Sequence, residues 1–375
     1  MKRWFLWLGL LLAAALPAGF LTAAGYGMSE LSSGHMTVLD NQGAAILKTG
    51  LVLAAGDRYI SENNRVYEIT AVEGTLAKAR YLGDEPPGET TDRTLPVQVP
   101  APPSGQLVAV YHTHDDESFI PSDGQAAIAG GGGIFKVGAA FAGRLTELGY
   151  QTEVDQTRHA PHDANAYERS RRTVVRLLSH QPAALFDIHR DSGPPGDDQV
   201  TVNGQNAAKM LLVVGQQNPY RQTSLDYAKS IKAAADAKHP GLIRGILAAH
   251  GSYNQDLAPR AMLVEIGTQH SRRQAAEYSA ALLADLVPLF LTPATAGSSA
   301  QDAKTGMPPA VPLPSGAAAD SYGRDIAAMI GALIAGSALY LFLSTGGWPE
   351  AKRRLNHFRN IEFINFLGIR GKRKK

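Results

Sequence analysis

The chain has 375 residues, of which 44% are hydrophobic and 19% charged, and it contains no cysteine. This composition suits one or two folded domains, and it excludes a disulfide-stabilised miniprotein and a wholly disordered chain. The stretch after Leu343 holds nine basic and two acidic residues, and Lys2 and Arg3 open the chain. Removing these from the totals of 36 basic and 34 acidic residues leaves 25 and 32 in the body. We therefore expect no nucleic acid partner, because phosphate binding needs clustered Lys and Arg.

Residues 1–29 are predicted to form a signal anchor in the membrane. Lys2 and Arg3 precede a long uncharged run from Trp4 to Ser29. Such a pattern is typical of a secretory signal or of an uncleaved membrane anchor. We favour the anchor, because no clean Ala-x-Ala cleavage site follows the apolar part; a cleaved signal is the alternative.

Residues 30–83 are predicted to form a small β-rich region next to the membrane. Turn residues separate four short β-type stretches, HMTVLD, AAILKTGLVL, RVYEITAVEG and LAKARYLG. Residues 84–105 are rich in Pro, Gly and Thr, which is the composition of a semi-extended linker.

Residues 106–292 are predicted to form an α/β domain with a largely parallel sheet flanked by helices. Strand patterns occur at QLVAVYHTH, YQTEVD, AALFDIHRD, KMLLVVGQ and AMLVEIG, and helical patterns of 10–20 residues alternate with them. Active sites in such sheets lie beyond the carboxyl ends of the strands. The polar residues at those ends are therefore the first candidates for chemistry.

The remaining residues predict a second membrane span. Residues 293–322 have the Pro, Ala and Ser content of a linker, and 323–345 contain the uncharged run from Ile326 to Leu343. A buried globular helix is the alternative, but the basic tail 346–375 favours a span. The positive-inside rule places both termini in the cytoplasm and residues 30–325 outside.

Three predicted strands end in residues that could bind a metal. One strand runs into His112, His114 and Glu117, the next ends at His189, and a third carries Glu265. A catalytic zinc site needs three such ligands, an open position for water and a carboxylate that takes the proton. Taken singly, each histidine could instead be a hydrogen-bonded structural residue, whereas a carboxylate in an apolar strand requires a partner.

Several segments of this domain resemble, in order, the stage II sporulation protein P family of endospore-forming bacteria. They are YHTHDDESF, AYERSRR, DIHRDS, VNGQNAAKMLLVVGQQNP and GILAAHGSYNQDLAPRAMLVEIGT, and the resemblance covers about 106–285. That family is similar to zinc-dependent N-acetylmuramoyl-L-alanine amidases. The resemblance implies an amidase-like fold. It also implies amidase and endopeptidase activity on the stem peptides of peptidoglycan during engulfment. It implies stage II sporulation proteins D and M as partners.

The resemblance also implies roles for individual residues. His112, Glu117 and His189 match the zinc ligands, and Glu265 matches the general base. Classical amidases place the ligand Glu further along the chain than Glu117, so His114 is the alternative ligand.

Other polar residues near the strand ends are secondary candidates: Asp187, Arg190, Asp191, Arg244 and Asn254. Either aspartate could hold the second ring nitrogen of His189. The two arginines suit bidentate pairing with stem-peptide carboxylates, or they form structural ion pairs. Asn254 could contact substrate or cap a loop.

Two classes of function follow from these patterns. The first is a membrane-anchored, zinc-dependent peptidoglycan hydrolase, which the complete His/Glu/His/Glu set favours. The alternative is a non-catalytic septal scaffold that binds cell wall and partner proteins. A different amidohydrolase specificity, such as that of a carboxypeptidase, is a third hypothesis.

Overall fold

The computed structural model describes residues 30–31, 33–86 and 105–291. Four predicted segments lie outside the described residues, namely both membrane segments at 1–29 and 323–345, the linker 293–322 and the tail 346–375. Most of the linker 84–105 is outside them as well. Within the described ranges, no helix is both long and apolar enough to cross a membrane.

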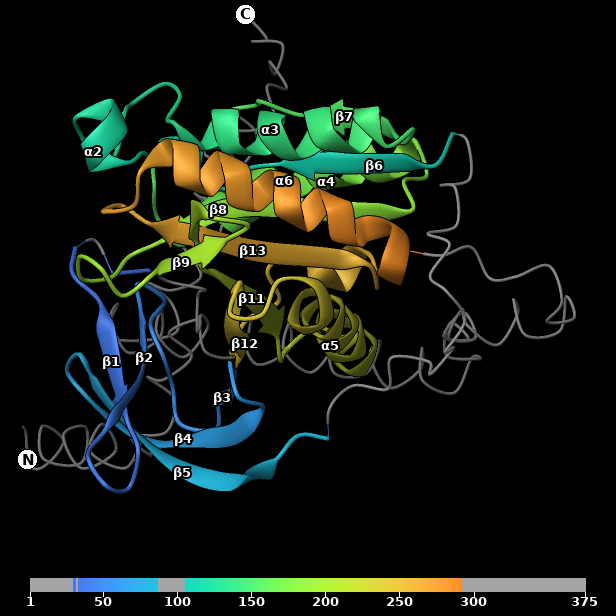
Figure 1. The fold of residues 1–375 in the computed structure, drawn as a ribbon. Coiled ribbons are helices and arrows are strands. Elements are labelled where there is room, and N and C mark those ends of the chain that lie inside the picture. Colours follow the sequence, from blue (N-terminus) through green and yellow to red (C-terminus); the bar gives the residue numbers. More distant parts are fainter. Residues whose placement is uncertain (1–29, 32, 87–104, 292–375) are drawn as a thin grey trace, which may run out of the picture. The chain divides into compact units, whose positions relative to one another are not determined.

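A single 11-stranded sheet runs through the described residues (Figure 1). Its first five strands are β1 (Met36–Leu39), β2 (Ala45–Thr49), β3 (Arg58–Ser61), β4 (Arg65–Glu73) and β5 (Leu76–Asp84). The others are β6 (Leu107–Tyr111), β7 (Gln151–Val154), β8 (Ala184–Asp191), β11 (Met210–Gly215), β12 (Ile243–Ala249) and β13 (Ala261–Thr268). The spatial order is β2-β1-β5-β4-β3-β12-β11-β13-β8-β6-β7. A separate hairpin is formed by β9 (Gln199–Val202) and β10 (Gln205–Ala208).

The strands from β6 onward confirm the predicted α/β arrangement. Pairs β6–β7, β6–β8, β8–β13 and β11–β12 are parallel, and only β11–β13 is antiparallel among the neighbours of this part of the sheet. The N-terminal strands pair mostly in antiparallel fashion, so the complete sheet is mixed.

Helices cover both faces of the α/β part of the sheet (Figure 1). The long helices are α3 (Ile134–Glu147), α4 (Ala166–Ser179), α5 (Arg221–Lys238) and α6 (Arg273–Phe290); α2 (Ile120–Asp123) and the 3₁₀ turn η1 (Gln255–Leu257) are short. Residues Val108 and Val110 of β6 share a core with α3, α5 and α6, whereas Ala109 and Tyr111 pack with α4. This division follows from the alternation of side chains along a strand, and it explains why β6 is apolar on both faces.

The β-rich region is not a separate unit, which corrects the predicted boundary at residue 106. Strand β3 pairs with β12 from Ser61↔Gly245 to Arg58↔Ala248 and thereby joins the two parts of the sheet. A Cβ added to Gly245 would lie 2.4 Å from the backbone oxygen of Ile60 and 2.4 Å from the ring of Tyr59. Glycine therefore permits the close approach of the two backbones. The described residues on both sides of the linker belong to one compact unit.

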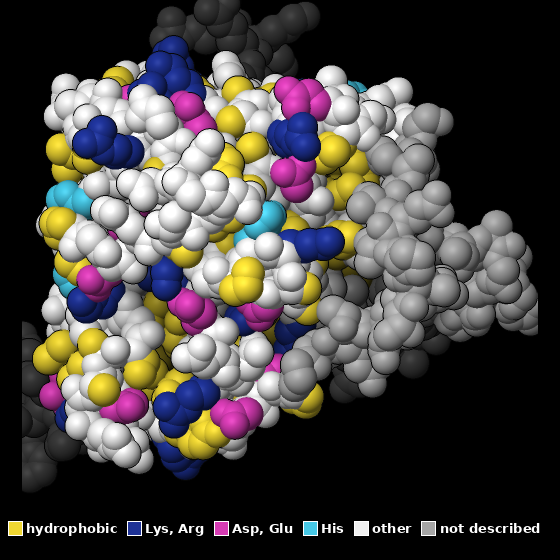
Figure 2. All heavy atoms as spheres, in the orientation of Figure 1, with side chains coloured by type: hydrophobic (Ala, Val, Ile, Leu, Met, Phe, Trp, Pro, Cys, Tyr) yellow, Lys and Arg dark blue, Asp and Glu magenta, His cyan; other side chains and the backbone are white. Residues whose placement is uncertain are grey.

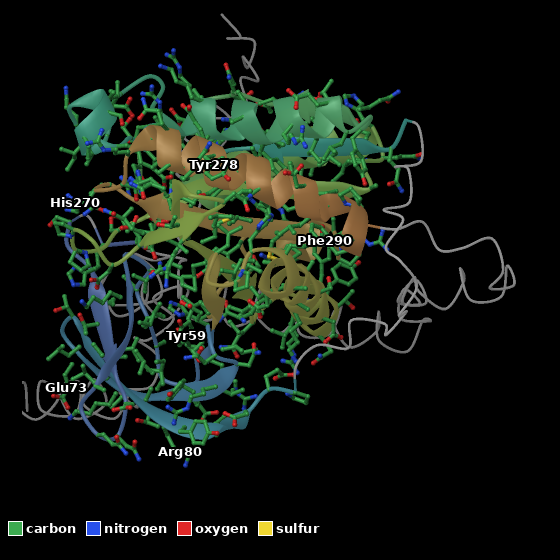
Figure 3. All side chains as sticks on the ribbon, in the orientation of Figure 1. Tyr59, Glu73, Arg80, His270, Tyr278 and Phe290 are labelled. Atoms are coloured by element: carbon green, nitrogen blue, oxygen red, sulfur yellow. The ribbon has the colours of Figure 1, made fainter. Side chains whose placement is uncertain are left out.

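The surface shown in Figure 2 carries Lys and Arg side chains interspersed with Asp and Glu. In the β-rich region, ion pairs such as Arg80–Glu68 at 3.1 Å link neighbouring strands. Glu73 and Arg80 lie on this outer part of the sheet, away from the helices (Figure 3). Pairs this exposed contribute little stability, so the β-rich region depends on its own apolar cluster and on its junction with the main sheet.

Candidate active site

Four side chains of metal-ligand type converge at the carboxyl edge of the sheet: Glu30, His114, Glu117 and His189. One potential ligand atom from each lies within 4.8 Å of the others. Glu117 Oε1 is 3.1 Å from His189 Nδ1 and 3.4 Å from His114 Nδ1, and Glu30 Oε1 is 3.1 Å from His114 Nδ1. We call these four residues the His/Glu cluster.

The sheet topology explains three members of the cluster. His114 and Glu117 lie in the loop after β6, and His189 lies near the end of β8, which is the parallel neighbour of β6. Parallel neighbours end at the same edge, as expected from the sequence. Glu30 comes from the segment before β1 and forms an isolated β-bridge with Leu51.

The cluster fits a bound metal ion. Within the described part of the chain, Glu30 Oε1 and both ring nitrogens of His114 are buried without a hydrogen-bond partner. A buried polar atom left in this way costs about 1–3 kcal/mol, which a coordinated cation would offset. Two imidazoles and two carboxylates form a donor set that suits a divalent transition metal.

Asp187 holds the other side of the His189 ring. Its Oδ1 lies 2.9 Å from His189 Nε2, a distance typical of an ion pair, although the alignment is not that of a hydrogen bond. The backbone N–H and hydroxyl of Thr113 both donate to Asp187, at 2.8 and 2.6 Å. Burial opposes a charge on His189, but the carboxylates of Asp187 and Glu117 raise its pKa well above the ordinary value. Of the two aspartates proposed from the sequence, Asp187 is the one beside His189.

His112, predicted as a ligand, lies outside the cluster, and the structure brings His114 there instead. His112 Nδ1 is 2.7 Å from the backbone oxygen of Ile188. A Cβ added to Gly138 of α3 would lie 2.5 Å from His112 Nε2, so the helix packs directly on this ring. Burial lowers the pKa of His112 to about 4, which keeps it neutral. Because β6 ends at Tyr111, the strand alternation that would align residues 112 and 114 does not continue.

Glu265 lies next to the cluster on β13. It is in register with His189 of the parallel neighbour β8, so the two side chains project from the same face of the sheet. Glu265 is buried, and its Oε2 has no hydrogen-bond partner among the described residues. Burial and then the charge of Asp191 raise the pKa of Glu265 well above its usual range. These influences favour the protonated carboxyl, and a cation held by the neighbouring cluster would favour the carboxylate instead.

Arg190 supports the cluster from its own backbone and side chain. Its N–H donates to Glu117 Oε2 at 2.7 Å. Its guanidinium donates to the backbone oxygens of Ser118 at 3.3 Å and Ala126 at 3.0 Å. These bonds fix the loop that carries Glu117, which is a structural use of the arginine.

Asp191 and Arg244 join the β-rich region to the α/β part. Arg244 donates to Asp191 Oδ2 and, at 2.7 Å, to the backbone oxygen of Lys48. Asp191 Oδ1 accepts from Thr49 Oγ1 at 3.0 Å and from the Gly50 N–H at 2.6 Å. The guanidinium predicted to pair with substrate is thus already paired with a buried carboxylate.

Asn254 also has a structural environment. Its side-chain amide donates to the Tyr167 backbone oxygen and to Ser170 Oγ, each at 3.0 Å. The Tyr167 ring in turn lies parallel to that of His189, with centroids 6.3 Å apart. Asn254 therefore positions α4 against the cluster.

A cleft of about 610 Å³ reaches the cluster at Glu30 and His114. Its walls include Glu30, His114, His162, Arg190 and His270. Figure 3 shows His270 beyond the end of β13, on the side of the molecule to which the strand ends point. The ring of His162 stacks on that of His114 with centroids 3.8 Å apart.

Sequence reasoning did not identify Glu30, His162 or Tyr167 as site residues. Glu30 and His162 lie outside the predicted strand ends, and Tyr167 lies in a predicted helix. No local pattern marks such residues, although AYERSRR, which contains Tyr167, was among the segments that carry the family resemblance.

The fold and the cluster together define an α/β protein with a candidate metal centre at the carboxyl edge of its sheet. The model of the family described as stage II sporulation protein P matches residues 57–288. This is more than half of the chain, and the chain belongs to that family. The match begins next to the start of β3 and therefore includes part of the β-rich region.

Individual relatives are more distant. Stage II sporulation protein P of Bacillus subtilis (strain 168) is 26% identical over an alignment of 246 positions, which covers 60% of this chain and 59% of that protein. The N-acetylmuramyl-L-alanine amidase Ami1 from Mycobacterium smegmatis is 16% identical with a TM-score of 0.34, covering 50% of this chain and 97% of its own. The CwlD amidase from Clostridioides difficile, solved with the GerS lipoprotein, is 10% identical with a TM-score of 0.35, covering 50% and 96%. Structural likeness of this size carries no argument about activity.

Proposed function

We propose that this protein is a peptidoglycan hydrolase of sporulation that cleaves an amide bond at the His/Glu cluster with the help of zinc. The observation that carries the proposal is the buried group of His114, Glu117 and His189 beside Glu265, of which His114 also lines an open cleft. Family membership supports the role in sporulation. The family's similarity to amidases suggests the bond between N-acetylmuramic acid and L-alanine, with endopeptidase cleavage as a second activity.

The proposed mechanism assigns a separate role to each residue of the site. His114, Glu117 and His189 would hold the metal, and Asp187 would orient His189. When bound, zinc lowers the pKa of a coordinated water toward ~7 and polarises the substrate carbonyl. Glu265 is the proposed general base, which takes a proton from the attacking water and returns it to the leaving amine.

We further propose that the protein is membrane-inserted with its cleft on the outer side, where peptidoglycan stem peptides are found. The two apolar runs and the basic ends of the sequence support this orientation. Stage II sporulation proteins D and M remain the proposed partners. A non-catalytic scaffold is the competing function, but it would not need a buried carboxylate in register with a potential ligand.

The test is to incubate the full-length protein with purified peptidoglycan and to identify the released fragments by mass spectrometry. The full chain is needed because β3 belongs to the same sheet as the site. We expect release of stem peptides with free L-alanine amino termini, and loss of release with a chelator. Glu265→Gln should lower turnover by roughly 10²–10⁴, the usual contribution of a general base, while bound zinc is unchanged.

The matched control is Glu73→Gln, which removes an exposed carboxylate of the β-rich region. It should behave as the wild type. Binding to peptidoglycan without release of any fragment would support the scaffold instead. Full activity of Glu265→Gln would remove this residue from the mechanism.

A further inference from the structure

Glu30 completes the His/Glu cluster from the segment before β1, whereas the other three members come from β8 and the loop after β6. Its Oε1 lies 3.1 Å from His114 Nδ1, and its Oε2 lies 3.4 Å from His162 Nε2. The side chain is 12% exposed and forms part of the cleft wall. Glu30 therefore lies between the cluster and the open cleft.

The number of ligands has a consequence for chemistry. His114, Glu117 and His189 would supply three ligands to a bound metal, and Glu30 would supply a fourth. Four protein ligands are typical of closed, structural zinc sites, whereas catalytic sites keep one position for water or substrate. With Glu30 in place, the position that a hydrolase needs is taken by the protein.

Glu30 is held in place by fewer backbone contacts than Glu117 and His189. His189 lies within a buried central strand, and the loop of Glu117 is fixed by Arg190. The Glu30 segment belongs to no strand: it forms an isolated bridge to Leu51, in which Leu31 N–H donates to Gly50 O at 2.8 Å. One backbone hydrogen bond is worth about 1 kcal/mol, and Leu31 also packs against the apolar cluster of the β-rich region. The Glu30 carboxylate can turn away from the site without the opening of any strand of the sheet.

We propose that Glu30 is a displaceable fourth ligand that keeps the centre closed until its carboxylate turns away. The proposal rests on the proposed function, because only a catalytic centre needs an open position. The stack of His162 on His114 places a second polar group against Glu30 and holds the carboxylate over the cluster. Withdrawal of Glu30 exposes the centre to the carbonyl oxygen of a substrate through the existing cleft.

The experiment measures access to the metal directly. The full-length chain is purified in detergent and loaded with Co²⁺, whose visible absorption reports its ligands. Acetohydroxamate, a small bidentate metal ligand, is then titrated into the wild type, Glu30→Gln and the control Glu73→Gln. The neutral amide of glutamine is a poor ligand, so Glu30→Gln should leave the fourth position free while the other three ligands retain Co²⁺.

We expect the probe to bind Glu30→Gln at least about tenfold more tightly than the wild type, since the apparent affinity of the wild type is reduced by its small open fraction. Glu73→Gln should match the wild type. Equal affinities in all three proteins, or loss of Co²⁺ from Glu30→Gln, would overturn the proposal. Muropeptide release is measured on the same preparations: a probe effect without release from any protein would contradict the hydrolase function and leave the role of Glu30 intact.

Discussion

Glu117 links the two histidines of the His/Glu cluster to each other and to the backbone of Arg190. One carboxylate oxygen lies within 3.4 Å of both histidines, and the other accepts from the backbone of Arg190. Burial opposes its charge, but His189 and His114 lower the pKa of Glu117 far below the usual range. The carboxylate is therefore fully ionised and held in one orientation, as a metal ligand requires.

Substitution of the two histidines after β6 should have different effects: one on metal affinity and the other on stability. His114→Ala should lower metal affinity by at least about 100-fold, because it removes a direct ligand, and loss of an outer-shell partner alone costs 10–100-fold. His112→Ala should retain the metal but lower the free energy of unfolding by about 1–3 kcal/mol, because it leaves a gap under α3. Equilibrium dialysis and thermal unfolding of both variants provide the measurement. Metal loss from His112→Ala alone would restore the assignment made from sequence.

At the scale of elements, the junction between β3 and β12 carries the β-rich region. Tyr59 of β3 donates to the backbone oxygen of Arg244 at 2.6 Å, and the Arg244 guanidinium pairs with Asp191 beneath it. Figure 3 places Tyr59 between the lower strands and the main sheet. Strand β8 carries both Asp191 of the junction and His189 of the site, so one strand positions residues of both.

Removing the Arg244 guanidinium from this junction should lower the free energy of unfolding. Arg244→Met leaves Asp191, which is 2% exposed, without its ion-pair partner. We expect a loss of about 3 kcal/mol in the free energy of unfolding, the usual effect of breaking a buried pair from one side. Arg80→Met, which breaks an exposed pair, should lose less than about 1 kcal/mol. Urea unfolding of both variants measures the difference, and equal losses would show that the junction is not a buried pair in solution.

At the scale of the whole molecule, the proposed orientation places the sheet and its cleft on one side of the membrane and both ends of the chain on the other. Protease added to intact protoplasts should then digest the described region and spare a tag at the C-terminus. The charge pattern of the ends is the physical reason, since basic flanks are retained in the cytoplasm. Digestion of the tag while the membrane stays sealed would contradict the two-span arrangement.

Local periodicity was sufficient for most of the α/β elements. Strands β6, β7, β8, β11 and β13 and helices α3 to α6 lie where the alternation of apolar patterns predicts them. Strands β3 and β12 were not predicted. β3 has four residues, and β12 is interrupted by Gly245. Both depend on pairing with each other across the chain, which no local pattern contains.

The sequence by itself determined that Glu117, His189 and Glu265 belong to one site, because the carboxyl ends of parallel strands meet at one edge of a sheet. Only the tertiary structure decided that His114 rather than His112 faces that site, since the choice depends on where β6 ends and on the contact of α3 with His112. Only the tertiary structure brought Glu30 to the same point. It reaches the cluster through a β-bridge to Leu51, and contacts between distant parts of a chain leave no trace in local spacing.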